Sequence, residues 1–151
     1  MTNYFLDTNI LWWYVVKTSK NHRIVKPFLD DLILNPSNSF TINEFVMIEL
    51  IHHLIKKKGT EGYRIAHKLL HETYPFFKIH YDISHNSDLS RILDFVKQYG
   101  MTTTIGGRDA SIIHSMAFHG IQEIITCDAG FEEVADIAVI NPLKMVSEHS
   151  G

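Results

Sequence analysis

Two short apolar segments, one near each end of the chain, stop at an aspartate. Tyr4–Leu6 is followed by Asp7, and Ile121–Cys127 is followed by Asp128. A short continuous apolar run is typical of a strand that is buried on both faces, as in a parallel sheet that helices cover. Open parallel sheets place their functional residues at the carboxyl ends of the strands. The two aspartates are therefore expected at the same edge of a parallel sheet.

Helical patterns separate the expected strands. Apolar residues at helical spacing, with cap and stop signals, predict helices at Asn9–Val16, Asn21–Leu34, Thr41 or Asn43 to Lys58, Thr60–Thr73, Ser84–Tyr99, Asp109–His119 and Phe131–Val134. Further strands are expected at Ser39–Ile42, Phe76–Tyr81 and Ile137–Ile140, and Met101–Ile105 is either a short strand or a loop. Pro27 is placed in the first turn of its helix and Gly59 just after a helix. This alternation predicts an α/β fold with a mainly parallel sheet between two layers of helices.

Length and composition limit the classes of protein to which the sequence can belong. The 151 residues fit one domain over residues 1–146, followed by a polar tail at 147–151. No apolar run approaches the roughly 20 residues of a membrane-spanning helix, and no signal peptide is recognised. The single cysteine, Cys127, excludes an internal disulfide framework, so we expect a reducing, cytoplasmic location. With a formal net charge of −3, contact with nucleic acid requires a local basic patch or a bound metal.

Four acidic residues are candidates for a shared site: Asp7, Glu49, Asp109 and Asp128. Each also has an ordinary structural explanation, since the aspartates suit helix caps or turns and Glu49 can pair with His53 four residues later. If the carboxylates converge, they cannot all remain ionised without a counter-charge. Mg²⁺ prefers oxygen ligands and can be held by a few carboxylates, with a substrate phosphate completing its shell. A water molecule bound to such an ion can attack a phosphodiester bond.

Other groups of residues leave alternatives open. Lys56–Lys58 either complements the C-terminal end of its helix or contacts phosphate. Trp12–Tyr14 is either part of the core or a surface on which bases stack. Arg108 can pair with an acid or contact a phosphate. Zinc is not expected, because one cysteine and scattered histidines, of which His67 and His71 are the best pair, form no recognisable site.

The candidate acids lie in four ordered segments, FLDTNIL, INEFVMIEL, GRDASIIHSMAFHGI and IITCDAGFEEV. In order and spacing, these segments resemble the acidic motifs of PIN-domain nucleases, including VapC-type toxins. The resemblance covers essentially the whole chain. It implies a three-layer α/β/α fold with a central parallel sheet, and a ribonuclease that depends on Mg²⁺ or Mn²⁺. It implies metal ligation by Asp7, Glu49, Asp109 and Asp128, and orientation of ligands and water by Asn9 and Thr126.

The sequence departs from the family pattern at one place. Relatives often carry a second acid two residues after the last motif aspartate, where this chain has Gly130. An auxiliary ligand beyond Asp128 is therefore unassigned. Glu132 and Glu133 are close enough along the chain to substitute, but both are better explained as charges on a surface helix.

The resemblance also implies a function and partners. The expected activity is hydrolysis of RNA by metal-activated water, without a covalent enzyme intermediate, and the protein can be the toxin of a toxin–antitoxin pair. A homodimer is expected separately, from the apolar helices. In such toxins the antitoxin inserts near the acidic site. One alternative is a non-catalytic interaction module of the same fold, whose acids receive a partner's Arg or Lys. Another is an aspartyl-phosphate phosphohydrolase with Asp7 as nucleophile, but that family carries a second aspartate where this chain has Asn9.

Overall fold

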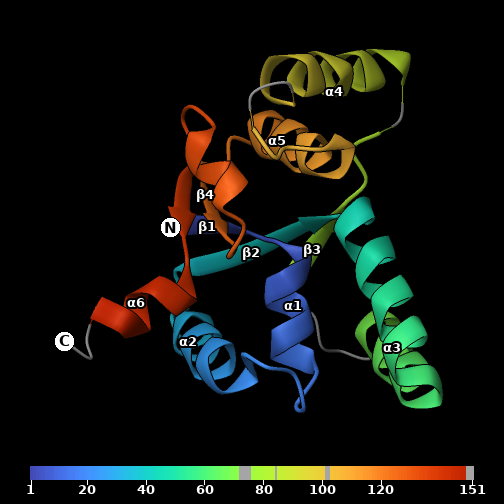
Figure 1. Cartoon of the computed structure of the whole chain (residues 1–151), viewed down its shortest axis with the longest axis vertical. Coiled ribbons are helices and arrows are strands. Elements are labelled where there is room, and N and C mark those ends of the chain that lie inside the picture. Colours follow the sequence, from blue (N-terminus) through green and yellow to red (C-terminus); the bar gives the residue numbers. More distant parts are fainter. Residues whose placement is uncertain (72–75, 84, 101–102, 149–151) are drawn as a thin grey trace.

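The structure is a computed structural model, and it describes residues 1–71, 76–83, 85–100 and 103–148. The described residues contain a five-stranded sheet with the order β3-β2-β1-β4-β5 (Figure 1). Its strands are β1 (Thr2–Leu6), β2 (Asn38–Asn43), β3 (Phe77–His80), β4 (Glu123–Ile125) and β5 (Ala138–Ile140). Every pairing between neighbouring strands of this sheet is parallel, which confirms the predicted parallel sheet.

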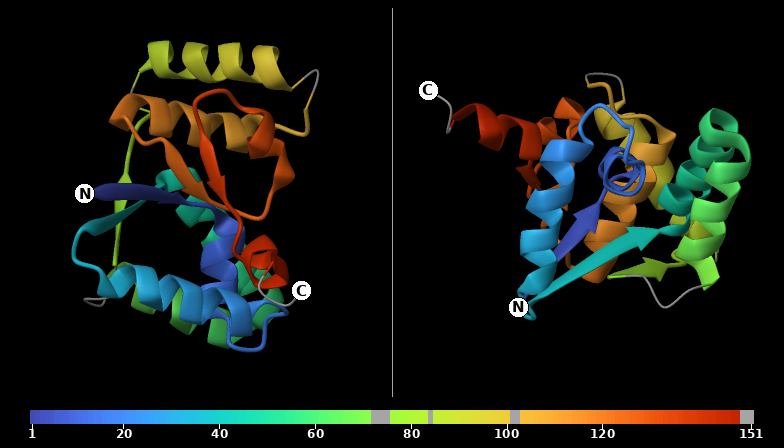
Figure 2. Two further views of the ribbon diagram at one scale, coloured as in Figure 1. Left: turned by 90° about the vertical axis from the view of Figure 1, so that its left-hand side faces the viewer. Right: turned by 90° about the horizontal axis from the view of Figure 1, so that it is seen from below.

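Helices connect the strands and cover both faces of the sheet. They are α1 (Thr8–Val15), α2 (His22–Leu34), α3 (Glu44–His71), α4 (Asn86–Tyr99), α5 (Gly107–His119) and α6 (Pro142–Glu148), with a 3₁₀ helix, η1 (Ala129–Glu133). In Figure 1 and Figure 2, α4 and α5 lie on one side of the sheet, and α1 and α2 lie on the other. The predicted three-layer α/β/α arrangement is therefore confirmed. Within the described ranges, no helix has the length and apolar character needed to cross a bilayer.

The central strand β1 explains why the core forms where it does. Phe5 pairs with Thr41 of β2 on one side and Ile124 of β4 on the other, so β1 has parallel neighbours along both edges. Helices cover both faces of the sheet, and continuous apolar residues rather than alternating ones therefore suit this strand. The largest fully buried side chains are Phe5, Leu6, Ile10, Leu11, Leu29, Ile42, Leu50, Leu54, Ile112, Met116, Ile124 and Phe131.

The predicted break at Gly59 is present, but within one helical element. α3 is 28 residues long, and Gly59 inside it has a non-helical backbone with φ 55° and ψ −127°. This residue divides α3 into two arms. The arms approach so closely that a Cβ atom added at Gly62 would lie 1.9 Å from the carbonyl oxygen of Leu54. Glycine is therefore required at Gly59 by the backbone conformation and at Gly62 by the close approach.

Other differences from the sequence analysis concern α2 and the end of the chain. Pro27 is the sixth residue of α2, so its placement in the first turn was wrong. The helix α6 was not predicted, although Asn141 followed by Pro142 is a recognised start signal. The backbone N–H of Leu143 donates to Oδ1 of Asn141 (3.0 Å), as in a capped helix. Residues 147 and 148, which were placed in the polar tail, are the last two residues of α6.

Some predicted boundaries fall on residues outside the described ranges. These are residues 72–73 at the end of the helix expected after Gly59, residue 84 at the start of the next one, and residues 101–102. In the remainder of Met101–Ile105, the described residues 103–105 form no strand. This segment therefore connects α4 to α5 as irregular chain at positions 103–105.

Candidate active site

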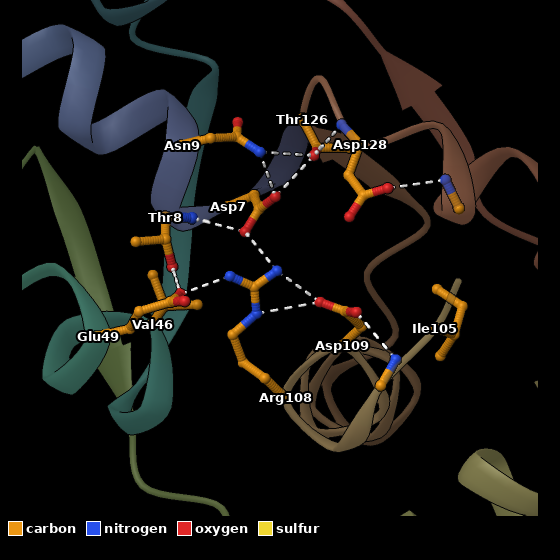
Figure 3. A network of polar contacts seen from close by, with 12 residues as sticks. Asp7, Thr8, Asn9, Val46, Glu49, Ile105, Arg108, Asp109, Thr126 and Asp128 are labelled. Carbon is orange, nitrogen blue, oxygen red and sulfur yellow. Dashed lines mark hydrogen bonds and ion pairs between the residues drawn. The ribbon is translucent and has the colours of Figure 1, made fainter. Parts of the chain in front are cut away.

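The parallel sheet brings the candidate acids to one edge. Asp7 directly follows β1, and Asp128 lies just beyond β4, the strand that pairs in parallel with β1. The backbone N–H of Asp7 donates to the carbonyl oxygen of Ile125 (3.2 Å), which ties the two strand ends together. Asp109 lies in the first turn of α5, and Glu49 lies in the first arm of α3. Figure 3 shows the four acids around one polar network.

Asp7 is the buried centre of this network, with an exposed fraction of 0%. Its Oδ1 accepts a hydrogen bond from the backbone N–H of Thr8 (2.6 Å). Its Oδ2 accepts from Nδ2 of Asn9 (2.7 Å) and from Oγ1 of Thr126 (2.7 Å). Burial raises the pKa of Asp7, although the positive charge of Arg108 and the hydrogen bonds act in the opposite direction. The three donors fix the orientation of the Asp7 carboxylate.

Arg108 supplies positive charge among the acids. Its Nη1 donates to Oε2 of Glu49 (2.5 Å), and its Nη2 donates to Oδ1 of Asp109 (2.6 Å). Nη2 also lies 3.9 Å from Oδ1 of Asp7. Although burial opposes the charged form, these carboxylates raise the pKa of Arg108 above its usual value. The sequence left Arg108 open between an acid and a phosphate, and here it pairs with acids, so the counter-charge comes from within the chain.

Glu49 is held from three directions. The hydroxyl of Thr8 donates to Oε2 (2.5 Å), Arg108 binds the same oxygen, and Nε2 of His53 lies 3.6 Å from Oε1. Partial burial opposes ionisation of Glu49, but hydrogen bonds from Thr8 and Arg108 outweigh it and lower the pKa of Glu49. The expected pair with His53 and a place in the acidic network are therefore both present. The sequence analysis missed Thr8, whose position beside Asp7 was the only signal.

Asp109 and Asp128 each close a turn as well as belonging to the network. The backbone N–H of Gly106 donates to Oδ2 of Asp109 (3.0 Å), as is typical of an acid in the first turn of a helix. The backbone N–H of Gly130 donates to Oδ1 of Asp128 (2.9 Å). The N–H of Asp128 donates to Oγ1 of Thr126 (3.0 Å), which itself binds the carboxylate that follows β1. Asp109 and Asp128 therefore have the structural role in turns that the sequence allowed, and they also belong to the group of acids that converge.

The donor set suits a divalent ion of the Mg²⁺ or Mn²⁺ type, because it offers carboxylate oxygens. The guanidinium of Arg108 already stands as a cation in contact with Asp7, Glu49 and Asp109. Among the described residues, these acids are not a group whose ligand atoms all lie within 4.8 Å of one another. The ligand types therefore fit a divalent ion, and in this structure the guanidinium of Arg108 lies between the three carboxylates.

Two lysines of Lys56–Lys58 have partners inside the protein. Nζ of Lys57 lies 5.1 Å from the centroid of the Trp12 ring, within range of a cation–π interaction. Nζ of Lys58 donates to Oγ1 of Thr18 (2.7 Å). Trp12 itself is half-buried against the core, as one of its two interpretations expected. Lys57 thus lies beside α1, and Lys58 contacts the segment that follows the C-terminal end of α1.

The sequence as a whole can be assigned to a protein family. The sequence matches the family of PIN domains over residues 4–137, which is most of the chain. This protein belongs to the PIN domain family. The resemblance that the four acidic segments carried is therefore confirmed. A comparison with curated protein sequences finds no significant match.

Several solved structures have a similar fold. VapC20 of Mycobacterium tuberculosis, a Sarcin-Ricin loop cleaving toxin, has a TM-score of 0.69 over 85% of this PIN domain and 92% of its own chain, with 14% identity. FitAcB of Neisseria gonorrhoeae has a TM-score of 0.69 over 93% and 98% of the two chains, with 24% identity. A toxin-antitoxin complex from Klebsiella pneumoniae has a TM-score of 0.59 over 91% and 96%, with 22% identity. At these identities the likeness establishes the fold.

Proposed function

We propose that this PIN domain is an endoribonuclease that hydrolyses RNA phosphodiester bonds with Mg²⁺ or Mn²⁺. The observation that supports it best is the convergence of acids from distant parts of the chain on one edge of the sheet, around a buried carboxylate. In this proposal Asp7, Asp109 and Asp128 ligate the metal, and Glu49 does so directly or through water. A bound divalent ion supplies an activated water and stabilises charge on the scissile phosphate and the leaving oxygen.

The other residues of the network position the ligands. Asn9 and Thr126 both donate to Oδ2 of Asp7, which leaves Oδ1 on the side of Arg108. That side is where a cation already stands, so the same oxygen faces the place that an ion would take. The hydroxyl of Thr8 positions Glu49 similarly, by donating a hydrogen bond to its Oε2. The attacking group in this proposal is water, and the enzyme forms no covalent intermediate.

The buried state of Asp7 argues against an aspartyl-phosphate phosphohydrolase. A nucleophilic carboxylate must reach the phosphorus atom of its substrate. The Asp7 side chain has no exposed surface, and both of its oxygens accept hydrogen bonds. A metal-bound water avoids this difficulty, because a ligand can act from the wall of a site.

Partners follow from the same proposal. One structure similar to this PIN domain is a toxin–antitoxin complex and another is a toxin, which supports an antitoxin as partner. We therefore propose the role of toxin in such a pair, in a cytoplasmic homodimer. Co-purification after co-expression with the neighbouring reading frame of its genome would test the partner. A chain that remains a lone monomer in that experiment and in sedimentation contradicts these two points, but not the hydrolytic activity.

The activity is tested with a fluorescently end-labelled RNA and purified protein in Mn²⁺, Mg²⁺ or EDTA. Asp7→Asn and Asp109→Asn are expected to lose at least about 100-fold in rate, as is typical when a group that stabilises transition-state charge is removed. Asp31→Asn, on the exposed side of α2, is the matched control and should cleave like the parent. Cleavage that persists in EDTA, or in Asp109→Asn with an unchanged melting curve, contradicts the proposal. Absence of Mn²⁺ binding in calorimetry favours the non-catalytic interaction module.

A further inference from the structure

A second cluster of metal-ligating side chains lies away from the acidic network. His80 is the last residue of β3, Asp82 follows it by two residues, and His119 is the last residue of α5. One ligand atom from each lies within 4.8 Å of the other two, and within the described ranges this is the group of three that meets that condition. Asp109 lies in the first turn of the same helix, ten residues before His119. At 1.5 Å per residue, the two sites are therefore about 15 Å apart.

The three side chains contact one another directly. Nε2 of His119 lies 2.6 Å from Oδ1 of Asp82. The rings of His80 and His119 stack with their centroids 3.6 Å apart and an interplanar angle of 22°. Burial, with the neighbouring His119, lowers the pKa of His80. Two imidazoles and a carboxylate thus share one small volume.

Contacts behind the cluster hold it in place. The other oxygen of Asp82 accepts a hydrogen bond from the hydroxyl of Ser115, one turn before His119 on α5. The backbone N–H groups of Asp82 and Ile83 donate to the carboxylate of Glu44, at the start of α3 (3.4 and 3.3 Å). Second contacts of this kind orient the ligands of metal sites. The segment after β3 is therefore fixed by α3 and α5 rather than free to turn away.

We propose that His80, Asp82 and His119 form a binding site for Zn²⁺ or a similar transition-metal ion. Two histidines and one carboxylate are a recognised zinc ligand set, with a fourth position left for water or an outside ligand. Tetrahedral ligands at about 2.0–2.1 Å from zinc are roughly 3.3 Å from one another. Binding therefore requires shifts of up to about 1.5 Å by ligand atoms that lie within 4.8 Å of one another, and a tilt of the two stacked rings so that both face the ion. The ion would join the edge strand β3 to the C-terminal end of α5.

The sequence analysis did not find this group, and it judged His67 and His71 to be the best pair of histidines. Those two rings lie 4.5 Å apart on the second arm of α3. In the part of the chain that the structure describes, no carboxylate completes a set of three with them. They provide a matched control, because they offer two histidines at helical spacing without the third ligand.

The site is tested by titrating the full chain, free of any purification tag, with Zn²⁺ in a calorimeter. We expect one tightly bound ion per chain and a rise in melting temperature of about 5–10 °C when free Zn²⁺ is about 100 times the dissociation constant of this tight site. His119→Gln and His80→Gln are each expected to weaken Zn²⁺ binding by at least about 30-fold and to abolish the rise in melting temperature. His67→Gln should bind Zn²⁺ like the parent.

A further variant distinguishes Zn²⁺ binding at the proposed site from Zn²⁺ binding at the acidic network. Asp109→Asn should leave the tight Zn²⁺ site intact, since Asp109 lies at the other end of α5. No Zn²⁺ binding by the parent, equal binding by His119→Gln, or loss of binding in His67→Gln or Asp109→Asn each overturns the proposal. The melting temperature of each metal-free variant shows whether it is folded. If His119→Gln does not fold, His80→Gln, on a different element, decides the question.

Discussion

Replacing Arg108 by glutamine is the sharpest test of how the acidic network works. In the parent, the guanidinium donates to Glu49 and Asp109 at 2.5 and 2.6 Å. A hydrogen bond to a charged group contributes about 1.5–3 kcal/mol. Because 34% of the Arg108 side chain is exposed, screening by solvent reduces the sum. We therefore expect Arg108→Gln to lower the free energy of unfolding by about 2 kcal/mol in metal-free buffer.

The same contacts oppose metal binding, because an ion and the guanidinium compete for the same carboxylates. An energy of about 2 kcal/mol corresponds to about 30-fold in a dissociation constant. Arg108→Gln should therefore bind Mn²⁺ about 30-fold more tightly than the parent, and saturating Mn²⁺ should restore its lost stability. The assays are calorimetric titration with Mn²⁺ and urea unfolding with and without the ion.

Arg91→Gln, on the exposed side of α4, is the control and should change neither quantity. Mn²⁺ affinity in Arg108→Gln that equals or falls below that of the parent would refute the competition. In that case Arg108 stays among the ligands when the ion is bound. Tighter Mn²⁺ binding supports the competition and equal or weaker binding refutes it, so the direction of the change decides the question even if the effect is smaller than about 30-fold.

Three further predictions concern single contacts. Burial raises the pKa of the Cys127 thiol to about 11. Alkylation of Cys127 below pH 8 should therefore be about 100-fold slower in the native than in the urea-unfolded protein, and its rate should rise only as the pH approaches that pKa. Equal rates in the two states would contradict this prediction. Thr8→Val removes a donor to Glu49 and should lower the unfolding free energy by about 1–2 kcal/mol, whereas Thr8→Ser should retain it in the same urea titration. In thermal unfolding, Gly62→Ala should lower the free energy of unfolding by about 3 kcal/mol, because the added Cβ would clash with the backbone of Leu54. Gly59→Ala should lower it by about 1–3 kcal/mol through backbone strain alone.

The parts of the fold that the sequence predicts are those with a local cause. β1 and the aspartate after it lie next to each other in the chain, and a buried parallel strand ending at the functional edge follows from that pattern alone. The break at Gly59 has the same local origin. The missed helix α6 is short and begins at Asn141, where the cap signal was present but the apolar pattern of a long helix was not.

Contacts between distant residues could not be predicted in the same way. Arg108 and Glu49 are 59 positions apart, and their pairing depends on how α5 approaches α3. His80 and His119 come from a strand and a helix whose ends meet only in the folded chain. The sequence therefore indicates which residue types are available, while the counter-charge of the acids and the second cluster depend on the packing of helices against the sheet.

The strand order β3-β2-β1-β4-β5 has a consequence during synthesis on the ribosome. β1 is translated before its neighbours, yet one of them, β4, emerges only after four-fifths of the polypeptide. Until then the hydroxyl of Thr126 that binds Asp7 does not exist, and one edge of β1 is unpaired. A nascent chain therefore cannot assemble the acidic pocket, and a translation product that terminates before residue 123 lacks β4, Thr126 and Asp128.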